Sequence, residues 1–413
     1  MNKMIKPTII SISMATVMAG AAISPAMALI GKAFPEVSAV KLKLVLTIPS
    51  LMIVFFSFVS SFLIMKLPKR TILLIGLSIY VVAGTGAQFV QSINTLLAFR
   101  LLLGVGVGLI MPLSMSLIND YFDGKERTIM MGYNTAFSNF GGIVTVMVAG
   151  FLANMSWRAP FNVYLMGLGI MGLVYFFLPK NEVPRSTPAM SQGRIPWIIY
   201  GYGLAMGGIM VAYYSIATSM ALYMEQNGIG GTALAGTIIS FTTIGGMITS
   251  LTLVHIEDLL KKYAIHIMLL LMGLSFTFLS MTTLIPVIIV SVLFIGFGQG
   301  VLFPLILLKV IDQVEIRKSD RAVAITTSFI FLGQFLSPIL LEAVSSIAAN
   351  ESVRFQYGFL AIAIFVIVAI HMALSFKKGP LTYLKKNWLS PGETAGEPPP
   401  RTEKTGLSKK PLK

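Results

Sequence analysis

The chain has no cysteine, only three histidines and few charged residues, and each shortage excludes a class of function. Without cysteine there are no disulfides and no thiolate metal ligands, and three scattered histidines are too few for a metal site. The sequence contains neither a Walker-type phosphate-binding loop nor a Gly-x-Ser-x-Gly elbow, so nothing supports ATP-driven work or hydrolytic catalysis. We therefore expect no enzyme activity, no metal and no cofactor.

Low charge is accompanied by a large apolar fraction, which predicts a membrane protein. Charged residues make up 11% and hydrophobic residues 55% of the 413 residues, whereas a soluble domain carries about 25% charged residues. A membrane-spanning helix needs about 20 apolar residues. Twelve segments meet this requirement: 8–30, 44–65, 71–90, 96–118, 129–152, 161–178, 197–222, 232–254, 264–284, 287–308, 322–342 and 355–376. We predict an all-α protein with 12 transmembrane helices in a lipid bilayer.

The basic residues are divided unevenly between the two sets of loops. Of the 31 Lys and Arg residues, 25 lie at the termini or in one set of loops, and only Arg100 lies within a span. The alternate loops hold the remaining five, which are Lys32, Lys41, Lys43, Arg158 and Arg354. Loops rich in Lys and Arg are cytoplasmic, so we expect a multi-pass protein of the cell inner (plasma) membrane with both termini in the cytoplasm. The net charge of +15 then reflects membrane topology, and we expect no nucleic-acid partner.

The two halves of the chain share a spaced cluster of glycines and one proline. The cluster recurs after 192 residues, with Gly104, Gly106, Gly108 and Pro112 in the first copy and Gly296, Gly298, Gly300 and Pro304 in the second. A fixed offset of this length indicates a duplicated unit. Two homologous membrane units are usual in secondary transporters. The apolar run that precedes Ala26-Met27-Ala28 also fits a signal peptide, but its removal would leave eleven spans and break the duplication.

The duplication predicts two pseudo-symmetric six-helix bundles. The first bundle covers residues 1–178 and the second covers residues 197–376. The segment 179–196 between them is polar and rich in proline, as expected of a cytoplasmic linker. Residues 377–413 are basic and then rich in proline, which predicts a disordered cytoplasmic tail.

Arg100 is the clear charge within a span, and two interpretations of it stay open. Burying it costs at least about 2.5–3.5 kcal/mol, so it should face the bundle interior and find a partner. It would then coordinate an anionic substrate group or a proton-carrying carboxylate. Alternatively, it is a structural anchor that donates hydrogen bonds to backbone carbonyls.

Candidates for a proton carrier are few, because the acidic residues lie at span ends or in loops. Glu342, in the last turn of the eleventh span, is the best of them, and a solvated carboxylate at a helix end is the alternative. His371 in the twelfth span could also titrate near neutrality, but a histidine on an apolar face with a local hydrogen bond is the favoured interpretation.

Several motifs resemble those of the major facilitator superfamily, most closely its bacterial drug/proton antiporters. Arg100 with Gly104 and Gly106 is similar to that family's Arg-x-x-x-Gly-x-Gly signature. Asp120 and the loop from Glu126 to Gly132 are similar to its acidic and Glu-Arg-x-x-x-x-Gly loop. Ser138 to Gly142 and Ser156-Trp157-Arg158 resemble its fifth span and the start of its sixth. The resemblance implies two six-helix bundles around a central cavity and alternating access. We also expect a monomer.

Two groups of residues follow as site candidates. Polar side chains within spans need partners in lipid, and the resemblance places several of them along the cavity. The substrate-binding candidates are Arg100, Asn134, Asn139, Tyr213, Tyr214, Gln299 and Gln334. The coupling or gating candidates are Asp120, Arg127, Lys66, Arg70, Glu257 and Glu342. For the amides and tyrosines, contact between helices without a substrate is the alternative.

Two departures from the family pattern affect coupling. The acidic position of the loop between spans two and three is Met65, while Glu257 occupies the equivalent place in the second half. A charge lock on the cytoplasmic side would then rest on one half. The glycine-proline pair typical of the antiporters' fifth span is Thr145-Val146 here, which weakens the case for export by proton exchange.

We therefore expect a secondary transporter that moves small organic molecules by alternating access. Proton-coupled efflux of drug-like or amphipathic compounds is the first interpretation. Uptake or exchange of a small organic anion through Arg100 is the second. A membrane receptor or lipid-modifying enzyme is a third, which the duplication disfavours because a receptor needs no pair of equivalent halves.

Overall fold

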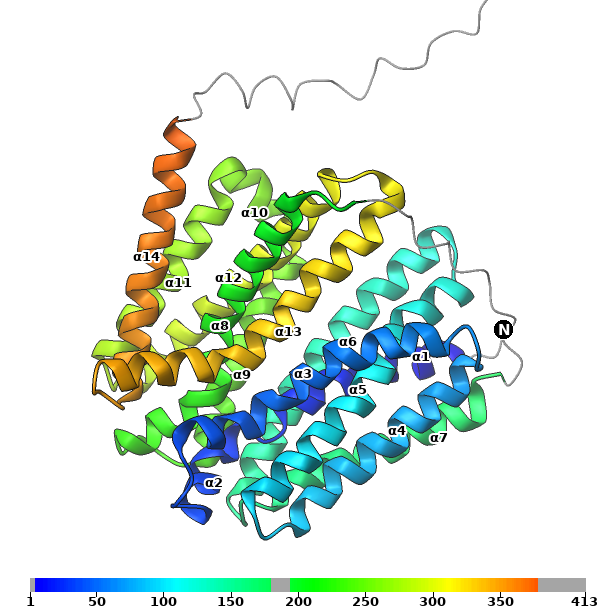
Figure 1. Ribbon diagram of the computed structural model, residues 1–413, viewed down its shortest axis with the longest axis horizontal. Coiled ribbons are helices and arrows are strands. Elements are labelled where there is room, and N and C mark those ends of the chain that lie inside the picture. The colour runs from blue at the N-terminus through cyan, green and yellow to red at the C-terminus, as the bar shows by residue number, and fades with distance from the viewer. Residues whose placement is uncertain (1–3, 180–193, 378–413) are drawn as a thin grey trace, which may run out of the picture. The chain divides into compact units, whose positions relative to one another are not determined.

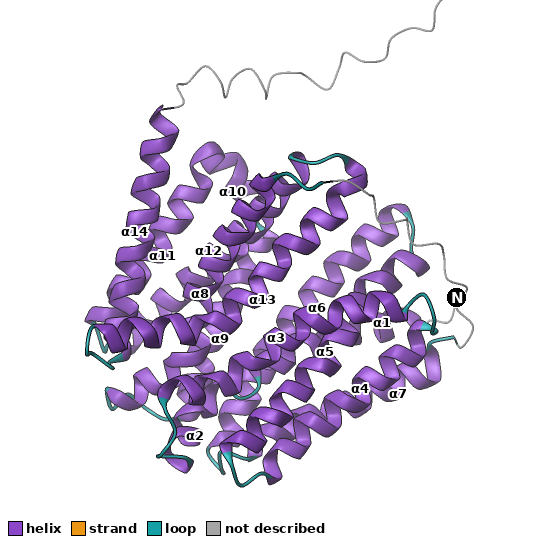
Figure 2. Cartoon of the chain, in the orientation of Figure 1, coloured by secondary structure: helices purple, strands orange, loops and turns teal. Residues whose placement is uncertain are grey.

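The computed structural model describes residues 4–179 and 194–377, and nearly all of them are helical (Figure 1, Figure 2). The first half of the chain contains α1 (Ile5–Ala21), α2 (Met27–Ala33), α3 (Ala39–Leu63), α4 (Lys69–Gly86), α5 (Ile93–Tyr121), α6 (Gly124–Ala153) and α7 (Met166–Phe177). The second half contains α8 (Trp197–Gln226), α9 (Thr232–Leu251), α10 (Leu253–Leu260), α11 (Ala264–Met281), α12 (Ile285–Asp312), α13 (Ile316–Ile347) and α14 (Val353–Lys377). Four short 3-10 helices join them: η1 (Ser24–Ala26), η2 (Ala87–Phe89), η3 (Ala159–Leu165) and η4 (Lys261–Tyr263).

Twelve helical segments in the described part of the chain are long and apolar enough to cross a membrane, which confirms the predicted number of spans. The first span is interrupted by η1, where Pro25 occupies the first turn and starts the new helix segment. The sixth span begins as a 3-10 helix at Ala159 and continues as α7. The predicted linker 179–196 and tail 377–413 fall almost entirely outside the described residues.

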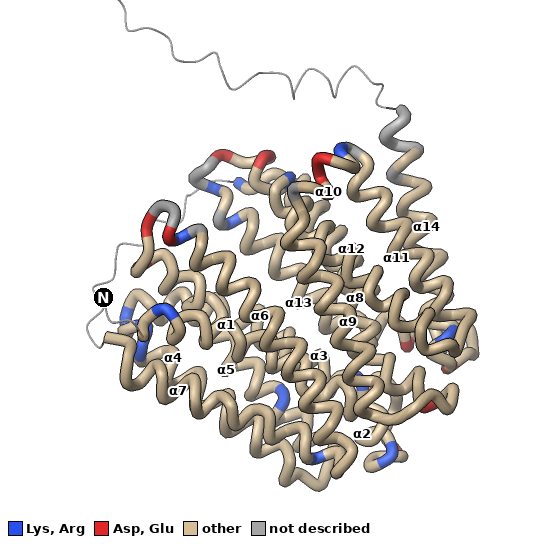
Figure 3. Tube along the Cα trace, turned by 180° about the vertical axis from the view of Figure 1, so that it is seen from behind, with Lys and Arg blue, Asp and Glu red and all other residues tan. Residues whose placement is uncertain are grey.

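The helices run back and forth, so their ends define two sides within residues 4–366. We call the side where α1 begins the near side, and the side where α2 ends and α3 begins the far side (Figure 1). Most Lys, Arg, Asp and Glu residues lie toward the helix ends, and the middle stretches of the helices are largely free of them (Figure 3). This is the pattern expected where lipid surrounds the middle of each helix and water surrounds its ends.

The helix contacts repeat between the two halves of the chain within the compact unit Met1–Val366. In the first half α3 packs on α5, α4 on α5, and α1 on α6. In the second half the equivalent helices pack the same way, with α9 on α12, α11 on α12, and α8 on α13. The two halves meet where α3 packs on α13 and where α6 packs on α9.

The repeated glycines explain why these helix pairs approach so closely. A methyl group added to Gly104 of α5 would clash with the carbonyl oxygen of Pro49 on α3, and one added to Gly296 of α12 would clash with that of Thr242 on α9. The pairs α3–α5 and α9–α12 are equivalent in the two halves. The duplicated glycines therefore serve equivalent helix crossings, as small residues do in membrane bundles.

Candidate functional site

The contact between α3 and α13 carries a row of polar side chains, which we call the seam. On α3 these are Lys43, Thr47 and Ser50, whose spacing of four and three residues places them on one face of the helix. On α13 they are Gln334 and Glu342, eight residues and therefore about two turns apart. Because the helices are antiparallel, Lys43 meets Glu342 near the far side and Ser50 meets Gln334 deeper inside.

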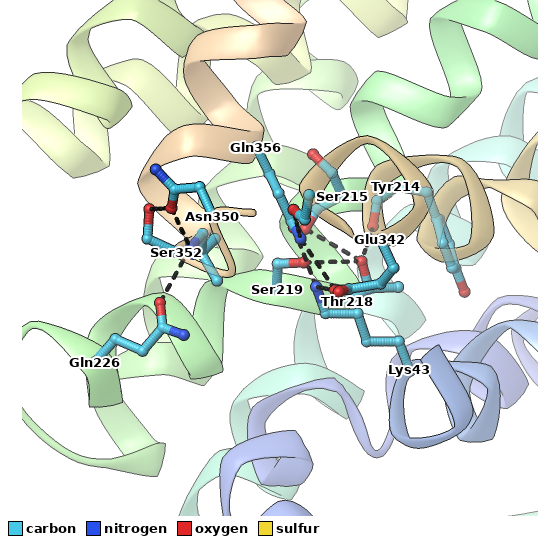
Figure 4. Close-up of polar contacts among 12 residues, drawn as sticks. Lys43, Tyr214, Ser215, Thr218, Ser219, Gln226, Glu342, Asn350, Ser352 and Gln356 are labelled. Atoms are coloured by element: carbon cyan, nitrogen blue, oxygen red, sulfur yellow. Dashed lines mark hydrogen bonds and ion pairs between the residues drawn. The ribbon is translucent and has the colours of Figure 1, made fainter. Parts of the chain in front are cut away.

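The deepest buried charges of the seam form one network (Figure 4). The Lys43 Nζ atom donates to Glu342 Oε1 at 2.6 Å and to Gln356 Oε1 at 3.1 Å. The Gln356 Nε2 atom, from α14, donates to the same Glu342 Oε1 at 3.0 Å and to Ser345 Oγ at 3.0 Å. The side chains of Lys43 and Glu342 are 2% and 11% exposed. Lys43 thus joins the first half of the chain to two helices of the second half.

This geometry corrects two expectations about the pair. Lys43 was expected in a loop before a span starting at residue 44, but α3 begins at Ala39 and the side chain is buried. Glu342 is not a solvated helix-end carboxylate, because its Oε1 atom holds an ammonium group in a nearly closed site. A buried pair of opposite charges is costly to break by removing one partner, typically about 3–5 kcal/mol.

One turn further along the seam, the polar contacts are between uncharged side chains, and one buried hydroxyl group has no hydrogen-bond partner. Ser50 Oγ donates to Gln334 Oε1 at 2.7 Å. Thr47 lies between the two pairs on α3 and is fully buried, and its Oγ1 atom has no hydrogen-bond partner among the described residues. A buried hydroxyl without a partner costs about 1–3 kcal/mol.

Toward the near side the seam turns apolar and opens into a hollow of about 340 Å³. Its lining is almost entirely hydrophobic and comes from α3 and α13: Leu51, Val54, Phe55, Phe58, Ser328, Phe329 and Leu332. The seam is therefore closed by polar contacts on one side of the Ser50–Gln334 pair and hollow on the other.

Further contacts between the two halves also lie toward the far side. Lys32 of α2 pairs with Glu225 of α8 at 2.7 Å, at a more exposed position than the Lys43 pair. In η1, Ser24 Oγ donates to the carbonyl oxygen of Ala217 in α8 at 2.6 Å. At the second crossing, Thr232 Oγ1 of α9 donates to Asn154 Oδ1, just beyond α6, at 2.8 Å. These contacts hold the far ends of the halves together at several points.

Arg100 lies inside the first half, 1% exposed, and its guanidinium is engaged there. Its Nε atom donates to the Val45 carbonyl at 2.8 Å, Nη1 to Tyr164 Oη at 2.6 Å, and Nη2 to the Ala19 carbonyl at 3.1 Å. These bonds tie α5 to α3, η3 and α1. The geometry favours the anchor interpretation over the anion contact.

Replacing Arg100 with lysine tests this interpretation. A lysine ammonium cannot reproduce the planar fork, and each buried carbonyl left without a donor costs about 1–3 kcal/mol. We expect Arg100→Lys to lower the melting temperature of the purified protein clearly, whereas Arg194→Lys, at an exposed arginine just before α8, should leave it nearly unchanged. Unchanged stability with a specific loss of anion binding would contradict the anchor role.

Two of the other predicted binding residues contact the opposite half of the chain. Gln334 on α13 accepts from Ser50 in the seam. The hydroxyl of Tyr214 on α8 lies against Gly20 of α1, so close that a methyl group added to this glycine would lie 3.1 Å from it. Asn134 lies within the first half and accepts from Ser114 Oγ at 2.9 Å. The remaining candidates are Asn139, which is partly buried on α6, Tyr213, which hydrogen-bonds to Thr243, and Gln299, which is partly buried on α12. Their roles in binding stay predictions.

Apart from Glu342, which lies in the seam, the predicted coupling or gating residues lie on the near side and do not form one cluster. Asp120 pairs with Lys69, which also donates to Ser116 Oγ at 2.6 Å. Arg70 donates to the Tyr175 carbonyl and lies over its ring. Lys66, Arg127 and Glu257 are exposed. The side chain of His371 lies outside the part that the structure describes.

Sequence reasoning missed Lys43, Ser50 and Gln356. For α3 a signal existed, because Lys43, Thr47 and Ser50 form a polar stripe at helical spacing within an otherwise apolar segment. For Gln356 there was none, because a single amide in the first turn of a span resembles any residue near the lipid headgroups.

A family profile described as Major Facilitator Superfamily matches residues 9–338 and 256–411. This chain belongs to the Major Facilitator Superfamily. Its relatives include the quinolone resistance protein NorA of Staphylococcus aureus (strain MRSA252), 23% identical over 330 residues that cover 74% of this chain and 80% of NorA. The niacin transporter NiaP of Acinetobacter baylyi is 26% identical over 129 residues, which cover 31% of this chain and 28% of NiaP.

Solved structures of the superfamily share the fold at low identity. A bacterial homologue of the human lysosomal transporter Spinster, in an inward-facing and unoccupied conformation, matches with a TM-score of 0.74 and 13% identity, covering 93% of this chain and 98% of that one. The nucleoside transporter NupG matches with a TM-score of 0.68 and 15% identity, covering 90% of this chain and 99% of that one. The all-α fold with twelve spans is thereby confirmed.

Proposed function

We propose that this superfamily member is a monomeric exporter of small, partly apolar organic molecules, driven by protons through alternating access. The observation that carries the proposal is the asymmetry of the seam. Polar pairs close it toward the far side, and an apolar hollow opens it toward the near side. A carrier that exposes one site to each side in turn needs such a contact between halves, closed on one side while the other admits solute.

The near side is cytoplasmic in this proposal, because it carries the loops rich in Lys and Arg. Residues 1–178 and 197–376 then act as the two moving bodies. The apolar lining of the hollow suits amphipathic solutes that enter from the cytoplasm or the inner leaflet. The relationship to a quinolone resistance protein supports the same substrate class and the direction of export. Anion uptake through Arg100 has less support, since that side chain already has three partners within the first half.

Transport in proteoliposomes tests the proposal. We expect purified protein to move a fluorescent quinolone and a lipophilic dye cation against their gradients when a proton gradient is imposed, and a protonophore should abolish this movement. Vesicles without protein serve as the control. Movement of small carboxylates alone would favour the anion carrier, and movement of none of these solutes would contradict the proposal.

A further inference from the structure

We propose that the hollow between α3 and α13 binds an anionic phospholipid of the near-side leaflet. One acyl chain fills the hollow, and the phosphate group lies beside Lys66 and Arg321, at the near-side ends of the two helices. The near-side leaflet is the cytoplasmic one in the function proposed above, but the site itself does not depend on which solute the protein moves.

The hollow faces the membrane. Leu51, Phe55 and Phe58 follow one another at steps of four and three residues, so they lie on one face of α3. The two aromatic side chains are 62% and 51% exposed, and α3 has no charged residue between Lys43 and its end. Exposed aromatic side chains in an uncharged stretch of a spanning helix are in contact with lipid. An acyl chain therefore reaches the hollow directly from the bilayer.

The deep end of the hollow and the basic residues are separated by the depth of one leaflet. Ser50 contacts Gln334, and thirteen residues further toward the near side lie the last residue of α3 and, on the antiparallel α13, Arg321. Arg321 is therefore level with the end of α3, next to the exposed Lys66. Fifteen residues separate Leu51 from Lys66, which is about 20 Å along a helix, and one leaflet with its headgroups is about 20 Å thick. A phospholipid with its phosphate at this level places its acyl chain in the hollow.

Lys66 and Arg321 lie where a phosphate group can reach them. Both side chains are exposed. The acid at the start of α13, Glu315, pairs with Lys318 at 3.3 Å, and both of these residues precede Arg321 on its water side. Long basic side chains near a helix end extend to the headgroup level, so Lys66 and Arg321 present their charge to the phosphate.

The equivalent contact between α6 and α9 lacks the apolar lining. The offset of 192 residues relates Phe55 to Met247 and Phe58 to Ser250. Ser250 Oγ donates to the Gly300 carbonyl oxygen at 3.3 Å, within the second half. A methionine and a serine do not form the aromatic wall that α3 presents, so the two contacts between the halves differ in their lining.

The charges at the near-side ends of the two contacts differ as well. The offset relates Lys66 to Asp258, and Glu257 stands beside that residue, both of them exposed. Arg127 on α6 is therefore accompanied by two acids at the end of the partner helix pair, whereas Arg321 on α13 is accompanied by Lys66. A general surplus of basic residues on the cytoplasmic side would favour both contacts alike. Of the two, the contact between α3 and α13 joins an apolar hollow to positive charge, which is what an anionic lipid requires.

Occupation of the hollow bears on the alternating access proposed above. Closing the near side brings α3 against α13 and removes the hollow, so a bound acyl chain stabilises the arrangement that is open on the near side. A solute that enters from the leaflet takes the place of the chain.

Site-specific fluorescence quenching tests the site, because a chain without cysteine accepts a single fluorophore at a chosen position. Ala324→Cys places it one turn from Ser328 of the hollow, and Gly132→Cys places it at the equivalent exposed position of α6. The protein is held in phosphatidylcholine nanodiscs that contain spin-labelled phosphatidylglycerol or spin-labelled phosphatidylcholine with the same acyl chains. At residue 324 we expect half-maximal quenching at an at least about fivefold lower mole fraction of the phosphatidylglycerol. At residue 132 the two lipids should quench alike.

Charge and volume variants separate the two parts of the site. With the fluorophore at residue 324, Lys66→Gln/Arg321→Gln should remove the preference for phosphatidylglycerol. Arg127→Gln/Lys261→Gln, at exposed basic residues elsewhere on the near side, should keep it. Ser328→Trp fills the hollow and should raise the half-maximal mole fraction of phosphatidylglycerol to that of phosphatidylcholine. Thermal unfolding of each variant in detergent establishes that it is folded.

Equal quenching by the two lipids at residue 324 overturns the inference, and so does a preference that is as strong at residue 132 or that survives in Lys66→Gln/Arg321→Gln. A preference unaffected by Ser328→Trp places the lipid outside the hollow, which also overturns it. The measurement uses no transported solute. Failure of quinolone transport would therefore overturn the proposed function and leave the lipid site standing.

Discussion

A chemical bridge between residues 50 and 334 is expected to abolish transport, and its reduction is expected to restore it. Ser50 Oγ and Gln334 Oε1 are 2.7 Å apart across the seam. In Ser50→Cys/Gln334→Cys, a short bifunctional methanethiosulfonate joins α3 to α13, so the far side cannot open. Because a covalent bond removes the outward-open population altogether, we expect quinolone flux to fall more than about tenfold. The chain contains no cysteine, so the reagent has no other target.

A bridge within one half is the matched control. Ser78 Oγ and Met171 Sδ lie 3.6 Å apart on α4 and α7 of the first half. The same reagent on Ser78→Cys/Met171→Cys should leave quinolone flux largely unchanged, since the halves are expected to move as bodies. Full flux in the bridged seam variant, with the bridge verified by mass spectrometry, would mean that α3 and α13 do not separate during transport.

Lys43→Met is expected to destabilise the protein strongly, and Lys43→Met/Glu342→Met to recover most of the loss. The single variant leaves Glu342 charged in a site where it is 11% exposed, and removing one partner of a buried pair costs about 3–5 kcal/mol. Replacing both charges with apolar side chains is often neutral for stability. Thermal unfolding of the two single variants, the double variant and wild type in detergent measures the coupling between the residues.

A Lys43→Met variant that unfolds at the same temperature as wild type would show that the pair is hydrated and contributes little to stability.

The twelve spans were predictable because they rest on local composition. A run of about 20 apolar residues forms a helix in lipid whatever its neighbours are, since its backbone has no other hydrogen-bond partners. The duplication was predictable for a similar reason. Glycines 192 residues apart serve equivalent crossings, and glycine at such a crossing leaves a recurring pattern in the sequence.

The sequence was less informative about individual charges. Arg100 stood out as a charge in a span, but its sequence context did not distinguish a substrate contact from an anchor. The choice depends on which carbonyls lie within reach, and those belong to Ala19 and Val45 on two other helices. Lys43 was counted with the loops because it lies just before the apolar run, although it is as buried as any core residue.

By itself, the sequence determined that the protein lies in a lipid bilayer, how many helices span it, which family it belongs to and that its two halves match. Each of these features follows from residues near one another or from a repeated spacing. Only the tertiary structure decided that Lys43 and Glu342, 299 residues apart, share one buried site. It also decided that Thr47 lies without a partner between two polar pairs, and that the seam changes from polar to apolar at Ser50. These features arise where helices from opposite halves meet, and the strength of an ion pair depends on the distance and exclusion of water that only this contact provides.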